Sequence, residues 1–298
     1  MKLLFYTFSL LLGLPALSQN IDSALLIKDL RTLSADNYEG RKTGTRGNRL
    51  AQLYILDQFK QIGLTAYNNT YEYPFYYQRG STRIMGTNLY GYIPGTLSQV
   101  IVITAHYDHL GTFKSASPRD TIYNGADDNA SGTAGLLAMA RYFKQHPPRY
   151  TLVFAALDAE EQGLQGAKAF LLQPPVPIAQ MRQNLNMDMI ARGDRNELYV
   201  CGTYHYPALK KYVDTVAAQA PIRLLTGHDR PSDGSGDWTG QSDHYEFFVK
   251  RVPFLYFGVE DHADYHQVTD EFSRINPVFY VRSVRTILQV VEKIDRNL

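Results

Sequence analysis

Predominantly apolar runs constrain the fold of this chain more than any other feature of its sequence. They lie at residues 100–105, 151–157, 185–190 and 252–257. Strands buried on both faces of a parallel sheet have this composition, whereas half-exposed strands alternate between apolar and polar residues. A sheet of this kind needs helices on both of its faces, so the runs predict an α/β fold.

Helical patterns lie between these strands. A helix is predicted over residues 48–61, capped by its first residue and stopped by Gly63. Residues 131–145 show the same apolar spacing, and a last helix is predicted to begin at Pro277. We therefore expect a three-layer α/β sandwich, with a mostly parallel mixed central sheet and helices on both faces. No boundary signal divides residues 19–298, which are predicted to form a single domain.

The N-terminus has the layout of a secretory signal peptide over residues 1–18. Lys2 supplies a positive charge, the following segment is largely apolar, and the small residues Ala16 and Ser18 lie two positions apart. A transmembrane helix needs about 20 apolar residues, and this stretch is shorter and ends at Pro15. We expect cleavage after Ser18 and a mature protein that is secreted or periplasmic, without stable membrane insertion.

The composition excludes several classes of function. Thirty Lys and Arg residues against 29 Asp and Glu give a net charge of +1 without a basic cluster, so we expect no nucleic-acid partner. A hydrophobic fraction of 44% over 298 residues allows a large buried core. Cys201 is the only cysteine, which excludes an intrachain disulfide, and its apolar surroundings predict a buried strand.

Polar side chains follow the predicted strands directly. His106 and Asp108 come after the first run, Glu160 and Glu161 come shortly after the second, and Asp188 lies within the third. In an open α/β sheet, ligands bind outside the carboxyl ends of the strands, so these groups are expected to converge. Imidazole and carboxylate groups without thiolate suit zinc, and also cobalt or manganese.

The spacing of these residues suggests which of them bind metal, which orient a ligand and which transfer a proton. His106 and Asp108 share a face of an extended chain, so Asp108 could hold the second ring nitrogen of a metal-bound His106. Glu160 and Glu161 point in different directions if the chain is extended there, which would let one bind metal while the other handles a proton. The acidic turn at residues 125–132 could supply a carboxylate that bridges two divalent cations.

The order of these motifs resembles that of the M28 family of co-catalytic zinc peptidases, the secreted bacterial aminopeptidases. The resemblance covers nearly the whole mature chain. It rests on residues 40–45, 86–95, 106–108, 125–132, 158–166, 186–188, 242–244 and 265–270. It implies an exported aminopeptidase that hydrolyses the N-terminal peptide bond of peptides with a free amino group.

The resemblance also implies two zinc ions per chain. The ligands that it implies are His106 and Asp188 for one zinc, Glu161 and His266 for the other, and Asp128 as the bridge between them. Two divalent ions carry four positive charges, which three carboxylates and a hydroxide would balance.

Further residues take implied roles around the metals. Glu160 would be the general base, Asp108 would orient His106, and Tyr265 would donate a hydrogen bond to the oxyanion. His244 would lie in the substrate pocket or support it. Trp238 is a candidate for the side-chain pocket, within a loop at residues 233–240 whose role stays open. The remaining histidines match no motif position and are expected to be structural or exposed: His109, His146, His205, His228 and His262.

Three other functions compete with this interpretation. A glutaminyl-peptide cyclotransferase shares the fold but uses one zinc, and residues 160–166 favour the peptidase instead. An M20-type carboxypeptidase inserts a domain before its last histidine. The stretch of sequence between Asp188 and His266 is too short to leave much room for such a domain. A non-catalytic binding module would lack ligands, whereas every expected ligand type is present here. The sequence does not specify the preferred side chain, the native metal or the oligomeric state.

Overall fold

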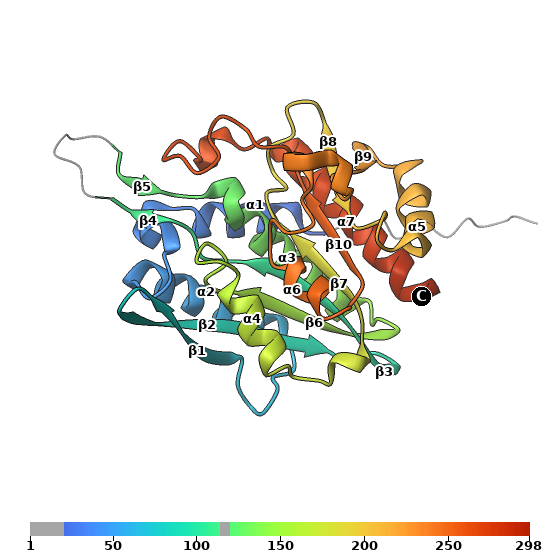
Figure 1. The fold of residues 1–298 in the computed structure, drawn as a ribbon, viewed down its shortest axis with the longest axis horizontal. Helices are drawn as coiled ribbons and strands as arrows, with labels where there is room; N and C mark the ends of the chain where they lie inside the picture. Colours follow the sequence, from blue (N-terminus) through green and yellow to red (C-terminus); the bar gives the residue numbers. More distant parts are fainter. Residues whose placement is uncertain (1–20, 114–119) are drawn as a thin grey trace, which may run out of the picture.

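The computed structural model describes residues 21–113 and 120–298 (Figure 1). The predicted signal peptide lies outside the described residues. The α-helices are α1 (Ser23–Leu33), α2 (Arg46–Ile62), α3 (Gly132–Gln145), α4 (Gln165–Leu172), α5 (Pro207–Ala217), α6 (His244–Val249) and α7 (Pro277–Asn297). Shorter helical turns are η1 (Asp36–Arg41), η2 (Ala126–Ser131), η3 (Ile178–Gln180), η4 (Pro231–Gly236) and η5 (Phe272–Arg274).

One eight-stranded sheet forms the centre of the molecule, in the order β1-β2-β6-β3-β7-β10-β8-β9. Its strands are β1 (Glu72–Arg79), β2 (Thr82–Ile93), β3 (Leu97–His106), β6 (Tyr150–Leu157), β7 (Met181–Met187), β8 (Glu197–Cys201), β9 (Arg223–Thr226) and β10 (Phe254–Gly258). A separate two-stranded ribbon pairs β4 (Gly111–Thr112) with β5 (Ile122–Tyr123). The four neighbouring strands β6, β3, β7 and β10 run parallel. The pairs β1–β2, β2–β6 and β10–β8 are antiparallel, and β9 pairs parallel with β8 at the edge of the sheet. The sheet is therefore mixed with a parallel centre, as predicted.

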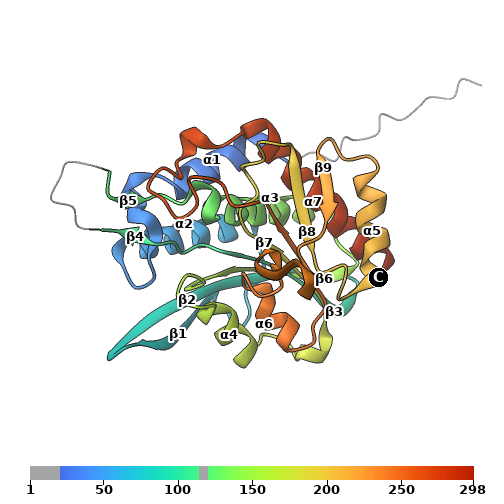
Figure 2. The same cartoon turned by 45° about the horizontal axis from the view of Figure 1, so that its top comes forward.

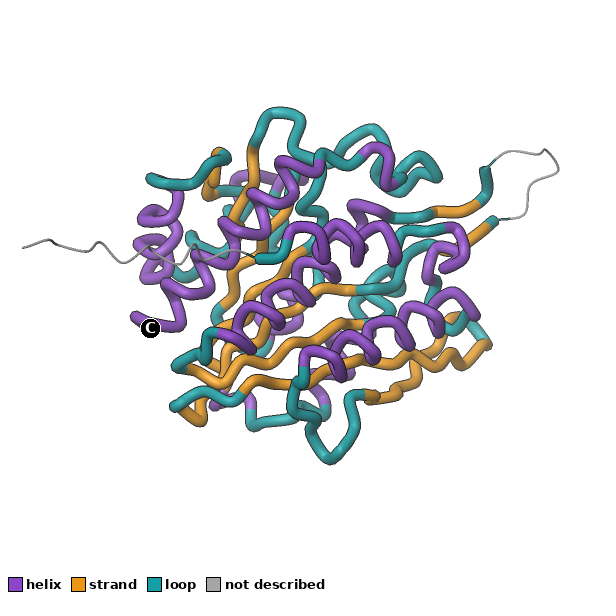
Figure 3. The backbone as a smooth tube through the Cα atoms, turned by 180° about the vertical axis from the view of Figure 1, so that it is seen from behind, coloured by secondary structure: helices purple, strands orange, loops and turns teal. Residues whose placement is uncertain are grey.

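Helices cover both faces of this sheet, and β3 shows why. Ile101 and Ile103 pack into the larger core with α1, α2, α3, α5 and α7. Val100 and Val102, on the opposite face, pack against α4 and α6. The two helical layers are visible on either side of the strands in Figure 2, and the larger one covers the face seen in Figure 3. The predicted three-layer sandwich is confirmed.

Helix α2 differs from the prediction at its start. Thr45, rather than Asn48, is its N-cap, and the Thr45 hydroxyl accepts the Asn48 amide N–H at 3.3 Å. The Asn48 side chain instead donates to the Arg41 carbonyl and to the Asp158 carboxylate, each at 3.0 Å. The predicted cap is therefore wrong, because tertiary contacts use the Asn48 amide. Gly63 ends the helix as predicted, with a left-handed φ of 73° that glycine adopts without strain.

Two other strands agree with the prediction in kind but differ in length. Strand β7 ends at Met187, so Asp188 lies just beyond it rather than inside it. Cys201 is fully buried at the end of β8, as expected. Within residues 21–113 and 120–298, no helix is both long and apolar enough to cross a membrane.

Candidate metal centre

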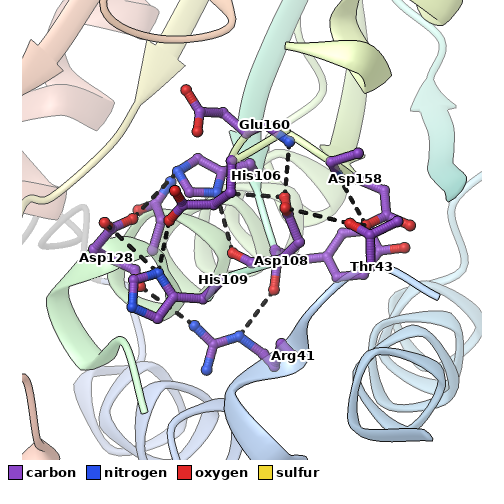
Figure 4. A network of polar contacts seen from close by, with 12 residues as sticks. Arg41, Thr43, His106, Asp108, His109, Asp128, Asp158 and Glu160 are labelled. Carbon is purple, nitrogen blue, oxygen red and sulfur yellow. Dashed lines mark hydrogen bonds and ion pairs between the residues drawn. The ribbon is translucent and has the colours of Figure 1, made fainter. Parts of the chain in front are cut away.

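The parallel strands β6, β3 and β7 are neighbours, so their carboxyl ends meet at one edge of the sheet. His106 is the last residue of β3, the turn that carries Glu161 follows β6, and Asp188 follows β7. The turn that carries Asp128 precedes α3 at the same edge (Figure 4). Residues far apart in the sequence therefore converge where the strand-end rule predicts.

Three ligand atoms form the first group of the centre. The Nε2 atom of His106 lies 3.2 Å from Asp188 Oδ1 and 3.5 Å from Asp128 Oδ1. The Ser242 hydroxyl donates to the other Asp188 oxygen at 2.7 Å. Asp188 Oδ1 is buried and has no hydrogen-bond partner among the described residues, so it is available to a cation.

A second group shares Asp128 with the first. Its Oδ2 atom lies 3.1 Å from His266 Nε2 and 3.6 Å from His109 Nδ1. Glu161 contacts the same two rings, at 3.4 Å from His266 Nε2 and 2.8 Å from His109 Nδ1. Two groups of three potential ligand atoms, each within 4.8 Å of one another, thus meet at one carboxylate: His106, Asp128 and Asp188, and His109, Asp128 and Glu161.

His109 is the residue of this centre that the sequence analysis missed. It was expected to be structural or exposed, yet its ring is fully buried against Glu161, and its Nε2 atom has no partner among the described residues. The signal available in the sequence was its position three residues after His106, on the same strand-end segment.

The charges of the site show whether a metal ion fits. Burial raises the pKa of Asp128, and the charge of Glu161 raises it further. Burial lowers the pKa of His106, but Asp188 and Glu160 outweigh this effect and hold its pKa well above the ordinary value. Without a cation the cluster must therefore bind protons to offset its carboxylates. Imidazole and carboxylate ligands around two positions fit divalent zinc.

Asp108 lies beside His106, but the contact differs in detail from the expectation. The Nδ1 atom of His106 lies 3.2 Å from the Asp108 backbone carbonyl and 3.7 Å from its carboxylate. The Asp108 carboxylate accepts the backbone N–H of Glu160 at 3.0 Å and the Thr43 hydroxyl at 3.4 Å. Asp108 thus connects the segment after β3 with the turn after β6.

Glu160 and Glu161 diverge, although the chain there is not extended as assumed. Strand β6 ends at Leu157, and Ala159 turns the chain with a φ of 58°. The Glu160 carboxylate makes no hydrogen bond or ion pair with any described residue, and burial raises its pKa well above the ordinary value. Burial also raises the pKa of Glu161, but hydrogen bonds from the histidines overcome this and hold its pKa low.

The loop that carries Tyr265 and His266 is hydrogen-bonded to the turn that carries Asp128. The Asp270 carboxylate accepts the backbone N–H groups of Asp127 and Asp128 at 3.0 Å. His262 Nε2 lies 3.2 Å from the Asp127 carboxylate, so His262 has a structural role, as expected. These contacts hold His266 beside the Asp128 carboxylate although the loop itself has little regular structure.

A cavity of about 230 Å³ opens over both groups. Besides the potential ligands, the cavity is lined by Glu160, Met189, Trp238, Gln241, Tyr256, Val259, Asp261 and Tyr265. Trp238 is held in place by His228, whose ring stacks on it at 3.8 Å. His244 supports the same wall, because it contacts the Trp238 carbonyl at 3.0 Å and stacks on Tyr256 at 4.4 Å.

The sequence matches Peptidase family M28 over residues 88–291, which is most of the chain. The chain belongs to Peptidase family M28. The matched range contains the whole cluster of carboxylates and imidazoles described above, and it confirms the resemblance found in the motifs.

Individual relatives agree with this assignment of the M28 chain. Aminopeptidase YwaD of Bacillus subtilis (strain 168) is 35% identical over 190 residues, covering 61% of this chain and 35% of that protein. The chain spans only 41% and 38% of the first curated relatives that it matches.

Solved structures support the fold of this M28 peptidase. A leucine aminopeptidase precursor from Bacteroides thetaiotaomicron VPI-5482 superposes with a TM-score of 0.73 at 18% identity, covering 92% of this chain and 97% of that one. A Bacteroides thetaiotaomicron glutaminyl cyclase bound to N-acetylhistamine gives a TM-score of 0.72 at 18% identity, covering 92% and 98%. The fold alone therefore does not separate the two activities.

Proposed function

We propose that this protein is an exported aminopeptidase that uses two zinc ions to hydrolyse the N-terminal peptide bond of peptides with a free amino group. The observation that carries the proposal is the pair of ligand groups that share the Asp128 carboxylate. His106 and Asp188 would hold one ion, and Glu161 and His266 the other, with His109 beside Glu161. Family membership and the relative named as an aminopeptidase support the reaction class.

Two bound zinc ions would polarise the scissile carbonyl and lower the pKa of an attacking water. Glu160 takes the proton of that water and passes it to the leaving amine. This assignment is supported by a carboxylate that faces the cavity without a protein partner and belongs to neither ligand group.

Two further residues orient the reaction. The Asp108 carbonyl contacts the His106 ring, and its carboxylate accepts the Glu160 backbone N–H. Asp108 thereby holds the two residues in place relative to each other. Tyr265 stacks on His266 at 4.0 Å and lines the cavity. Burial raises the pKa of its hydroxyl, so the group stays protonated and can donate to the developing oxyanion.

A screen of aminoacyl arylamides tests the proposal. The purified protein should release arylamine from substrates with a free amino group, lose this activity to a chelator and regain it with zinc. Acetylation of the substrate amine should abolish turnover. Cleavage of N-acetylated substrates alone would indicate an endopeptidase or a deacylase instead.

The glutaminyl cyclase among the fold neighbours makes cyclisation the second candidate. A cyclase would release ammonia from N-terminal Gln peptides, ignore Leu and Ala arylamides, and bind about one zinc per chain. That outcome would replace the peptidase proposal.

A further inference from the structure

Arg41 is a buried cation outside the chemistry described so far. Its side chain is 1% exposed and belongs to the motif at residues 40–45. The guanidinium makes short hydrogen bonds to four backbone carbonyls, those of Tyr107 at 2.8 Å, Leu33 at 2.7 Å, Asn124 at 2.6 Å and Gly125 at 2.9 Å. A single side chain thus satisfies acceptors from three separate segments.

Two of those segments carry metal ligands. Tyr107 directly follows His106, and Gly125 begins the turn that leads to Asp128. The Asp128 carbonyl itself lies 3.5 Å from the guanidinium. The guanidinium of Arg41 therefore connects the backbone beside His106, a proposed ligand of the first metal position, with the turn of Asp128, whose carboxylate both positions would share.

The backbone that presents Arg41 is held in an unusual conformation. Arg41 has a φ of 49° and Gly40 a φ of 63°. A Cβ atom on Gly40 would lie 2.4 Å from the Gly111 carbonyl oxygen, so only glycine fits there. Asn48 fixes the segment further by donating to the Arg41 carbonyl. Left-handed geometry at a non-glycine residue costs about 1–3 kcal/mol and persists only where the surroundings determine it.

The charge of Arg41 is not neutralised by direct pairing. None of its hydrogen bonds goes to a carboxylate among the described residues, whereas a buried arginine usually forms a paired fork with one. The negative charges of Asp128 and Asp108 attract the Arg41 guanidinium at longer range, without a hydrogen bond between the side chains. Burial lowers the pKa of Arg41 to about 10, so it remains charged at neutral pH.

We propose that Arg41 is a positioning residue that sets the separation between the His106 segment and the Asp128 turn, and thereby the zinc affinity of the centre. The inference rests on the two-zinc site proposed above. Without the guanidinium, the four carbonyl dipoles would converge on a buried space that contains no donor, and the two segments would move apart. Ligands must stay within about 0.5 Å of their geometry, and loss of outer partners typically weakens metal binding 10–100-fold.

Substitutions at Arg41 and at a matched arginine test this role. Arg41→Lys keeps the charge but cannot span the carbonyls of Tyr107 and Gly125 together, and Arg41→Met removes both charge and donors. Arg141 is the control, because it ties α3 to Asp29 at 2.6 Å and lies away from the metal ligands. Zinc affinity is measured by competition with a chromophoric chelator, and the absorption spectrum of bound Co²⁺ reports the ligand geometry. Urea unfolding of the metal-free proteins measures their stability.

We expect both Arg41 variants to bind zinc about 10–100-fold more weakly, with an altered Co²⁺ spectrum. Arg141→Lys and Arg141→Met should lose stability yet keep the zinc affinity and the spectrum of the unaltered protein. Folded Arg41 variants that bind zinc as tightly as the unaltered protein would overturn the inference and leave the proposed function intact. If Arg41→Lys fails to fold, Arg41 is required for folding as a whole, and this outcome also overturns the inference. Absence of zinc binding in the unaltered protein would overturn both proposals.

Discussion

Replacing Glu160 by Gln should separate proton transfer from metal binding. Gln has nearly the same size and shape but cannot accept the proton of the attacking water. We expect kcat to fall at least about a hundredfold while the protein keeps close to two zinc ions per chain. General bases typically contribute 10²–10⁴-fold, so a hundredfold loss corresponds to about 2.7 kcal/mol of activation free energy.

The contacts of Glu160 explain why the metal should remain. Its carboxylate belongs to neither ligand group and contacts no described residue by a hydrogen bond or ion pair. Its backbone N–H donates to Asp108, and this contact with the neighbouring segment is unaffected by the substitution.

The same substitution should not weaken the metal-free protein. Burial raises the pKa of Glu160 in the folded state, so its ionised form destabilises that state at pH values above the ordinary pKa. Neutral Gln removes this penalty. The melting temperature of chelator-treated Glu160→Gln at pH 7 should therefore equal or exceed that of the unaltered protein.

Three measurements on one preparation check these expectations. Steady-state kinetics gives kcat, metal analysis gives the zinc content, and calorimetry gives the melting temperature of the metal-free protein. Glu72→Gln is the control, because Glu72 on β1 forms an exposed ion pair with Arg49 on α2, and neither residue lines the cavity. A Glu160→Gln protein that loses its zinc, or that keeps full turnover, would refute the role assigned to this carboxylate.

Four further outcomes can be measured. Asp128→Asn should lose both zinc ions and activity in metal analysis, because the shared carboxylate contacts both ligand groups. His109→Phe should weaken zinc binding tenfold or more in a titration, since its Nδ1 atom orients Glu161; unchanged affinity would leave it only a packing role. Burial lowers the pKa of His244 to about 4, so only the unfolded chain takes up this proton between about pH 6.5 and 4. Stability should fall across that window by about 3 kcal/mol, and His244→Phe should flatten the fall in unfolding curves. Terminal sequencing should find Gln19 as the first residue of the exported protein, and an intact cytoplasmic form would contradict this.

The sequence alone determined the architecture and most of the candidate ligands. Apolar runs identify the central strands because burial on both faces favours apolar side chains. His106 and Asp188 could be predicted because each lies at or near the carboxyl end of a predicted strand, where the path of the chain is regular. The choice of Glu161 over Glu160 as the ligand, and the assignment of His266, required the resemblance to a family, since neither periodicity nor spacing decides them.

The tertiary structure decided the contacts that hold these ligands. His109 and Glu161 are 52 residues apart, and Arg41 reaches Gly125 across 84 residues. Such contacts depend on left-handed turns, including those at Arg41 and Ala159, whose geometry is fixed by packing around them rather than by their own propensities. Local patterns specify where strands end, but the directions of side chains beyond those ends follow from loops that only the folded core brings together.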